Sequence, residues 1–127
     1  AEMIKAWYGG AGMPNATFSD TYVPSGWSGN ASLYTAVVAP YCRTCHIVRG
    51  NGAQSDIDFH TLAKFQGSQD RIKAHVFDRG NMPLAKIVYD AFYGSTRPEL
   101  MATFLQDQGY TARSSNGAAL RPGRVRP

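Results

Sequence analysis

Cys42-Arg43-Thr44-Cys45-His46 is the stretch that decides how this chain is interpreted. Two cysteines three residues apart lie on the same side of a helical turn, and the imidazole of the next residue reaches the same space. This spacing suits two thioether bonds to the vinyl groups of one haem, with a histidine nitrogen on the iron. The motif therefore predicts one covalently attached haem c, bound through Cys42 and Cys45, with His46 as a metal ligand.

Two other uses of paired cysteines fit less well. A disulfide-exchange pair is expected in a βαβ context, which this chain lacks. A zinc site needs four ligands, and beyond the motif the chain offers only His60 and His75, in no finger-like spacing.

Outside the motif, apolar residues recur at helical spacing, and valine, isoleucine and threonine do not alternate as they would in strands. Helices are expected before the motif and over residues 59–65, 69–78, 85–92 and 97 to about 109. Their inward positions are Leu33, Tyr34, Val37, Val38 and Tyr41 in the first, and Leu100, Met101, Phe104 and Leu105 in the last. The expected class is all-α, with about four to five short helices around one haem.

With 127 residues, 43% of them apolar, the chain is long enough for one domain. Composition divides it into an irregular, aromatic and glycine-rich N-terminal extension packed on the body (1–30), a core domain (31–112) and a flexible basic tail or linker (113–127). No stretch has the ~20 apolar residues of a membrane span, and no signal-peptide pattern is present.

The formal net charge of +4 comes entirely from the tail. Residues 1–112 carry nine basic and nine acidic side chains, and the surplus is Arg113, Arg121, Arg124 and Arg126. The domain therefore shows no basic face, and nucleic acid is not an expected partner.

A haem iron has two axial positions, and the second has four methionines and two histidines as candidates. Met82 is the strongest, because a Gly80-Asn81-Met82-Pro83 loop can direct one side chain inward from irregular backbone. Met101 belongs to an apolar stripe, and the remaining candidates are Met3, Met13, His60 and His75.

The haem motif, followed by Asn81-Met82-Pro83 and a terminal helix, resembles a monohaem, His/Met-ligated cytochrome c over about residues 31–108. The resemblance implies Cys42 and Cys45 as attachment points, His46 as proximal ligand and Met82 as distal ligand. The chain departs from this family in having no proline between Pro40 and Pro83 to orient the proximal imidazole. Another carbonyl in the 50–60 loop is expected to do so.

Four further residues are candidate contacts of the haem. Asn81 either hydrogen-bonds near the Met82 sulfur or makes the turn. Arg79, Trp27 and Tyr89 are candidate donors to the haem propionates, because buried carboxylates need donors nearby.

Six iron ligands leave no open position for a substrate, so the first hypothesis is a one-electron carrier and not an enzyme. Its partner would be another redox protein or domain, and the isolated domain is expected to be monomeric, without membrane insertion. The resemblance points to the bacterial periplasm or an extracellular location. The chain is also expected to be a domain excised from a larger secreted or membrane-tethered redox protein.

Two alternatives belong to other functional classes. The first is a peroxidase-like haem enzyme or a gas sensor, in which the distal methionine is displaceable and His60 or His75 acts with Arg79. The second is a binding module, for instance for carbohydrate, with Trp7, Tyr8, Tyr22 and Trp27 as an exposed aromatic platform. Solvent exposure of the two tryptophans discriminates the platform from ordinary packing.

Overall fold

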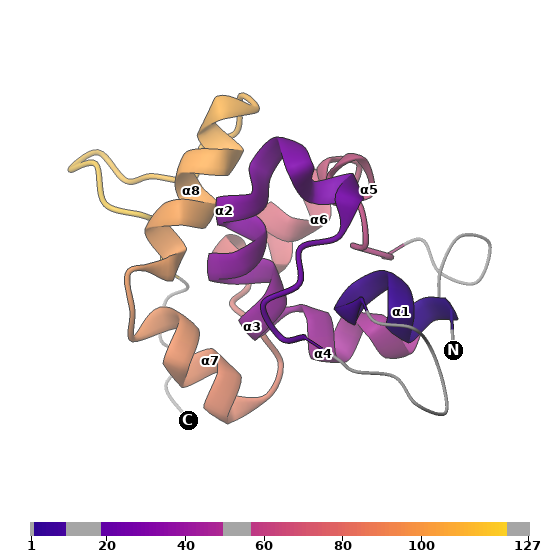
Figure 1. The fold of residues 1–127 in the computed structure, drawn as a ribbon. Coiled ribbons are helices and arrows are strands. Elements are labelled where there is room, and N and C mark those ends of the chain that lie inside the picture. Colours follow the sequence, from indigo (N-terminus) through magenta and orange to yellow (C-terminus); the bar gives the residue numbers. More distant parts are fainter. Residues whose placement is uncertain (1, 10–18, 50–56, 122–127) are drawn as a thin grey trace. The chain divides into compact units, whose positions relative to one another are not determined.

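The computed structural model describes residues 2–9, 19–49 and 57–121, which are mainly helical (Figure 1). These residues form no β-strand, and one isolated antiparallel bridge joins Arg113 to Ala119. The all-α prediction is therefore confirmed over the described residues. Among them, no helix has the length and hydropathy that a membrane span requires. The chain divides into two compact units, Ala1–Ser68 and Gln69–Pro127, and the division falls inside the predicted 31–112 domain.

The first unit is a succession of short helical segments. Those on the N-terminal side of the motif are α1 (Glu2–Tyr8), η1 (Ser25–Asn30), α2 (Ala31–Leu33), η2 (Tyr34–Val38) and α3 (Ala39–Tyr41). Those that contain or follow it are α4 (Arg43–His46), η3 (Ile47–Arg49) and α5 (Leu62–Gln66).

The helix that leads into the motif runs continuously through α2, η2 and α3 (Figure 1). Asn30 caps its start, with its side-chain oxygen accepting from the backbone N–H of Leu33 at 3.3 Å. The helix widens to π spacing just before Pro40, which has no N–H to offer the preceding turn. This helix therefore leads directly to Cys42, whose N–H still donates to the Val38 carbonyl at 3.0 Å.

An aromatic cluster forms the core of the first unit. Trp27 is fully buried, and its ring centroid lies 5.2 Å from those of both Tyr34 and Phe65. Phe59 meets Phe65 edge-on at 5.0 Å. The predicted inward positions Leu33, Tyr34, Val37 and Val38 are all buried, whereas Tyr41 is only half-buried.

The N-terminal extension is more regular than its composition predicted, because Glu2–Tyr8 form helix α1, beside η3. Gly9 ends this helix with φ +69°, and its N–H donates to the Lys5 carbonyl at 2.8 Å. A Cβ on Gly9 would lie 2.9 Å from the Tyr22 ring, so only glycine fits there. A helix of seven residues is too short for its apolar residues to show a recognisable helical period in the sequence.

The described part of the second unit, residues 69–121, contains three helical stretches. The first is α6 (Gln69–Ile72), which continues into η5 (Lys73–Asp78), and α7 (Lys86–Tyr93) and α8 (Arg97–Asp107) follow. Their bounds match the predicted ranges to within about two residues. Met101, Phe104 and Leu105 are buried as predicted, but Leu100 is 42% exposed, because four residues spanning 100–105 cover a wider arc than α8 buries.

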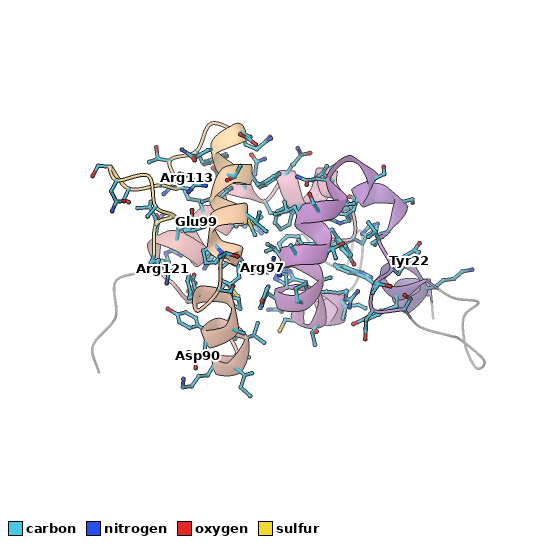
Figure 2. All side chains as sticks on the ribbon, turned by 60° about the vertical axis from the view of Figure 1, so that its left-hand side comes forward. Tyr22, Asp90, Arg97, Glu99, Arg113 and Arg121 are labelled. Atoms are coloured by element: carbon cyan, nitrogen blue, oxygen red, sulfur yellow. The ribbon has the colours of Figure 1, made fainter. Side chains whose placement is uncertain are left out.

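The chain beyond α8 closes a turn on that helix, in a segment for which composition predicted a flexible tail from residue 113. Arg113, Glu99 and Arg121 lie along this turn and α8 in Figure 2. The Arg113 guanidinium pairs with the Glu99 carboxylate and donates to Thr103 Oγ1 at 2.7 Å. The Ala119 N–H donates to the other Glu99 oxygen at 3.0 Å, and Arg121 donates to the Tyr93 carbonyl at 2.8 Å. Residues 113–121 are therefore tied to α7 and α8, and 122–127 lie outside the described residues.

Replacing Glu99 with glutamine is expected to loosen this turn. The Ala119 N–H and then the Arg113 guanidinium lower the pKa of Glu99, so its stabilising contribution is present above the pKa of an unfolded glutamate and is lost as pH falls through the lower folded value. Hydrogen exchange at the Ala119 amide should become several-fold faster in Glu99→Gln, and in the unaltered chain at acid pH. Asp107→Asn on the same helix is the control, and unchanged exchange in Glu99→Gln would disprove the role of the carboxylate.

Candidate haem-attachment site

The five motif residues occupy one turn of helix in the first unit. Cys42 is the N-cap of α4, and its carbonyl accepts from the His46 N–H at 3.0 Å. Cys42 is half-buried and Cys45 is exposed, and both are free thiols. The two cysteines lie three residues apart on this turn, and His46 follows them directly.

The protonation state of Cys42 argues against a disulfide-exchange centre. Burial, with a smaller contribution from Cys45, raises the pKa of the Cys42 thiol to about 12. Catalytic cysteines of redox motifs have lowered pKa values, because the thiolate is the nucleophile. In this chain Cys42 stays a protonated thiol at neutral pH, so the structure gives the redox-pair interpretation no support.

His46 is held by a backbone carbonyl through one ring nitrogen. Its Nδ1 lies 2.8 Å from the carbonyl oxygen of Ile57. A carbonyl oxygen can only accept, so Nδ1 carries the hydrogen and Nε2 keeps its lone pair. The carbonyl expected from the 50–60 loop is thus that of Ile57, and it fixes the tautomer in which Nε2 can bind a metal.

The ring of His46 is also fixed in orientation and kept neutral. The Phe59 ring stacks on it, with centroids 4.1 Å apart and planes inclined by 18°. Burial lowers the pKa of the His46 imidazole; the Ile57 carbonyl opposes this shift, and Arg49 adds to it. The imidazole is therefore neutral at pH 7, the form in which histidine binds metals.

Arg43, between the two cysteines, ties the N-terminal extension to the motif. It is only 5% exposed; its Nη1 donates to the Asp20 carbonyl and its Nη2 pairs with the Asp20 carboxylate, both at 3.4 Å. Its guanidinium also lies 4.1 Å from the ring centroid of Tyr8. No sequence signal marked this role, because a buried arginine is not recognisable from residue type alone.

Met82 belongs to the second unit, where it is half-buried in the loop before α7. The N–H groups of Asn81 and Met82 both donate to the His75 carbonyl, at 3.0 and 3.1 Å. The Asn81 side-chain oxygen accepts from His75 Nδ1 at 2.9 Å. Asn81 thus takes part in the turn through its N–H and its side-chain oxygen, and His75 is engaged in holding the loop.

The Tyr93 hydroxyl fastens the Met82 loop to η5. It donates to the Val76 carbonyl and lies 3.0 Å from the carbonyl oxygen of Met82. Burial, and to a smaller extent Tyr89, raise the pKa of Tyr93 above its usual range, so the hydroxyl stays a donor. Sequence reasoning did not find Tyr93, because both acceptors are backbone atoms.

The other candidate ligands have different surroundings. His60 Nδ1 lies 2.5 Å from the buried Asp58 carboxylate, in the first unit. Met101 is 2% exposed in the apolar stripe of α8, as expected for a core residue. Met13 and the side chain of Met3 lie outside the described residues.

The three candidate propionate donors differ in their surroundings. The Trp27 indole N–H donates to the Phe59 carbonyl at 2.8 Å, so it is already used within the unit. Arg79 is exposed and Tyr89 is half-buried against Tyr93, with ring centroids 4.5 Å apart. Trp7 Nε1 and Arg43 Nε are buried, with no hydrogen-bond partner among the described atoms, and such donors suit an added acceptor.

The aromatic-platform interpretation loses its two largest members. Trp7 and Trp27 are both 0% exposed, and Tyr8 and Tyr22 are half-buried. The exposure of the tryptophans was the observation that would separate a platform from ordinary packing, and it favours packing.

The donor set of the first unit fits a covalently bound haem. Two unpaired thiols on one helical turn match two vinyl groups, and a neutral imidazole with a free Nε2 follows them directly. No cluster of three or more histidine, cysteine or acidic side chains able to hold a metal ion occurs in the described part of the chain, so the zinc interpretation gains no support there. In the comparisons with known proteins, the chain matches no family model, no curated protein and no solved structure.

Proposed function

We propose that this chain is a monohaem c-type cytochrome that carries single electrons. Cys42 and Cys45 would hold the haem through thioethers, each formed by addition of S–H across a vinyl group. His46 Nε2 and the Met82 sulfur would be the axial ligands of the iron. The fold would then be a small cytochrome c-like one, in which the short helices cover one haem.

The observation that carries this proposal is the hydrogen bond between His46 Nδ1 and the Ile57 carbonyl. An imidazole that points Nε2 away from a fixed carbonyl is oriented for a metal, and a carbonyl on Nδ1 raises the basicity of Nε2. Nothing in disulfide exchange requires this orientation. It occurs one residue after two free thiols, which is where an attached haem needs its proximal ligand.

Electron transfer is the chemistry that the proposed ligand set favours. A bound haem supplies a one-electron couple, and a thioether ligand favours the reduced iron and raises its potential. If His46 and Met82 both bound the iron, substrate would have no access to the metal. The partner would be a redox protein or domain, on the periplasmic or extracellular side of a bacterium, and the isolated domain would be monomeric.

Voltammetry of the holoprotein adsorbed on an electrode tests this function. The expected result is one reversible one-electron couple whose current is unchanged by hydrogen peroxide or dioxygen. A catalytic current on adding either oxidant would overturn the carrier proposal in favour of the haem-enzyme alternative. Ligand-induced loss of the couple with carbon monoxide would favour a gas sensor.

Removing the Tyr93 hydroxyl is expected to make Met82 easier to displace. In Tyr93→Phe the Val76 and Met82 carbonyls lose the one donor that lies between them, and the loop is less firmly fixed. The apparent affinity of the oxidised protein for added imidazole should rise about fivefold, as loss of one ordinary hydrogen bond implies. Tyr89→Phe is the control, and equal affinities in both variants would refute the role of Tyr93.

A further inference from the structure

The segment that holds His46 belongs to neither a helix nor a strand. Ile57 supplies the carbonyl and Phe59 the stacked ring, so two of three consecutive residues contact the imidazole. Ladder hydrogen bonds do not fix residues 57–59, and no proline stiffens the chain between Pro40 and Pro83. Something else must therefore hold the carbonyl in place.

The middle residue of this segment is anchored through a buried carboxylate. The Asp58 side chain is 0% exposed. One of its oxygens accepts from the backbone N–H of His60 at 3.0 Å and from His60 Nδ1 at 2.5 Å. The other accepts from Lys64 Nζ at 3.0 Å, on α5. Burial of an ionised carboxylate is costly, and these charge-assisted bonds offset that cost.

A second anchor comes from the N-terminal extension. The Trp27 indole N–H donates to the Phe59 carbonyl at 2.8 Å, and the Trp27 ring packs against the rings of Tyr34 and Phe65. Helix α5 therefore holds the segment through the Asp58 side chain, and η1 holds it through the Phe59 carbonyl.

We propose that Asp58 and Trp27 are positioning residues, which hold the Ile57 carbonyl on His46 Nδ1 and thereby set the reduction potential of the bound haem. This inference rests on the proposed function. The carbonyl makes Nε2 more electron-donating, and a stronger donor favours the oxidised iron. Releasing the segment weakens that bond, so the potential rises.

Asp58→Asn and Trp27→Phe in the haem-loaded chain test this inference. Asparagine keeps the shape of Asp58 but loses its charge, and phenylalanine keeps a ring at position 27 but loses the N–H. Both variants should show a higher midpoint potential, and exchange of the His46 Nδ1 hydrogen, followed by NMR in the reduced protein, should be about fivefold faster. Trp27→Phe keeps the test open if Asp58→Asn fails to fold.

Tyr34→Phe is the matched control. It removes a polar atom from the same buried cluster, where the Tyr34 hydroxyl contacts the Trp7 carbonyl at 3.5 Å and not the 57–59 segment. It should leave both readouts unchanged. Haem-loaded Asp58→Asn and Trp27→Phe with the unaltered potential and exchange rate would overturn this inference and leave the proposed function standing. An unaltered chain that never acquires haem would overturn both.

Discussion

Replacing Cys42 and Cys45 together with alanine is expected to abolish covalent haem attachment. Under the proposed attachment each thiol would supply one thioether, and the chain has no other cysteine. After denaturation the variant should carry no haem by mass spectrometry and show no haem staining, whereas the unaltered chain keeps one haem through the same treatment. The single variant Cys45→Ala should retain one haem through Cys42.

Thr44→Ala is the control for this experiment, because Thr44 is an exposed residue of the same turn. It should carry haem as the unaltered chain does. A double cysteine variant that still holds haem after denaturation would show that the attachment lies elsewhere. The loss should also destabilise the chain, since a group bound only in the folded state adds its binding free energy to folding.

Met82→Ala is expected to produce the second largest effect. Loss of a thioether ligand removes the factor that favours reduced iron, so the reduction potential should fall by on the order of 100 mV, within the ~0.8 V range that axial ligands span. The reduced variant should also bind carbon monoxide. Potentiometric titration and visible spectroscopy measure the two changes.

Met101→Leu is the matched control for Met82→Ala. It removes a second sulfur of the same unit but keeps an apolar side chain in the core of α8. It should retain the potential and the resistance to carbon monoxide. A reduction potential that falls in Met101→Leu and stays unchanged in Met82→Ala would show that the distal ligand has been assigned to the wrong methionine.

Much of the fold could be predicted because its helices have strong local signals. The stripe before the motif and the stripe of α8 identify buried faces, and Gly109 adopts a positive φ where α8 was expected to end. Helix α1 was not predicted because it is stabilised by burial of Trp7 and is too short to show a helical period of apolar residues. The C-terminal turn was not predicted because it depends on bonds from Arg113 to residues ten or more positions earlier in the chain.

The candidate site could be predicted only where side-chain identity carries the chemistry. The cysteines and His46 are recognisable from their spacing alone. Ile57 is not, because its contribution is a carbonyl that every residue possesses, and only the fold decides which carbonyl reaches His46. Trp27 was one of three candidate donors to the haem propionates, and the fold directs its indole N–H to the Phe59 carbonyl.

The visible spectrum of the purified holoprotein, oxidised and reduced, with and without carbon monoxide, tests the central claim most directly. Ligation by His46 and Met82 predicts a weak sulfur-to-iron band in the oxidised protein and no binding of carbon monoxide by the reduced protein. Absence of that band together with ready binding of carbon monoxide would contradict the account and leave an enzyme or a gas sensor in its place.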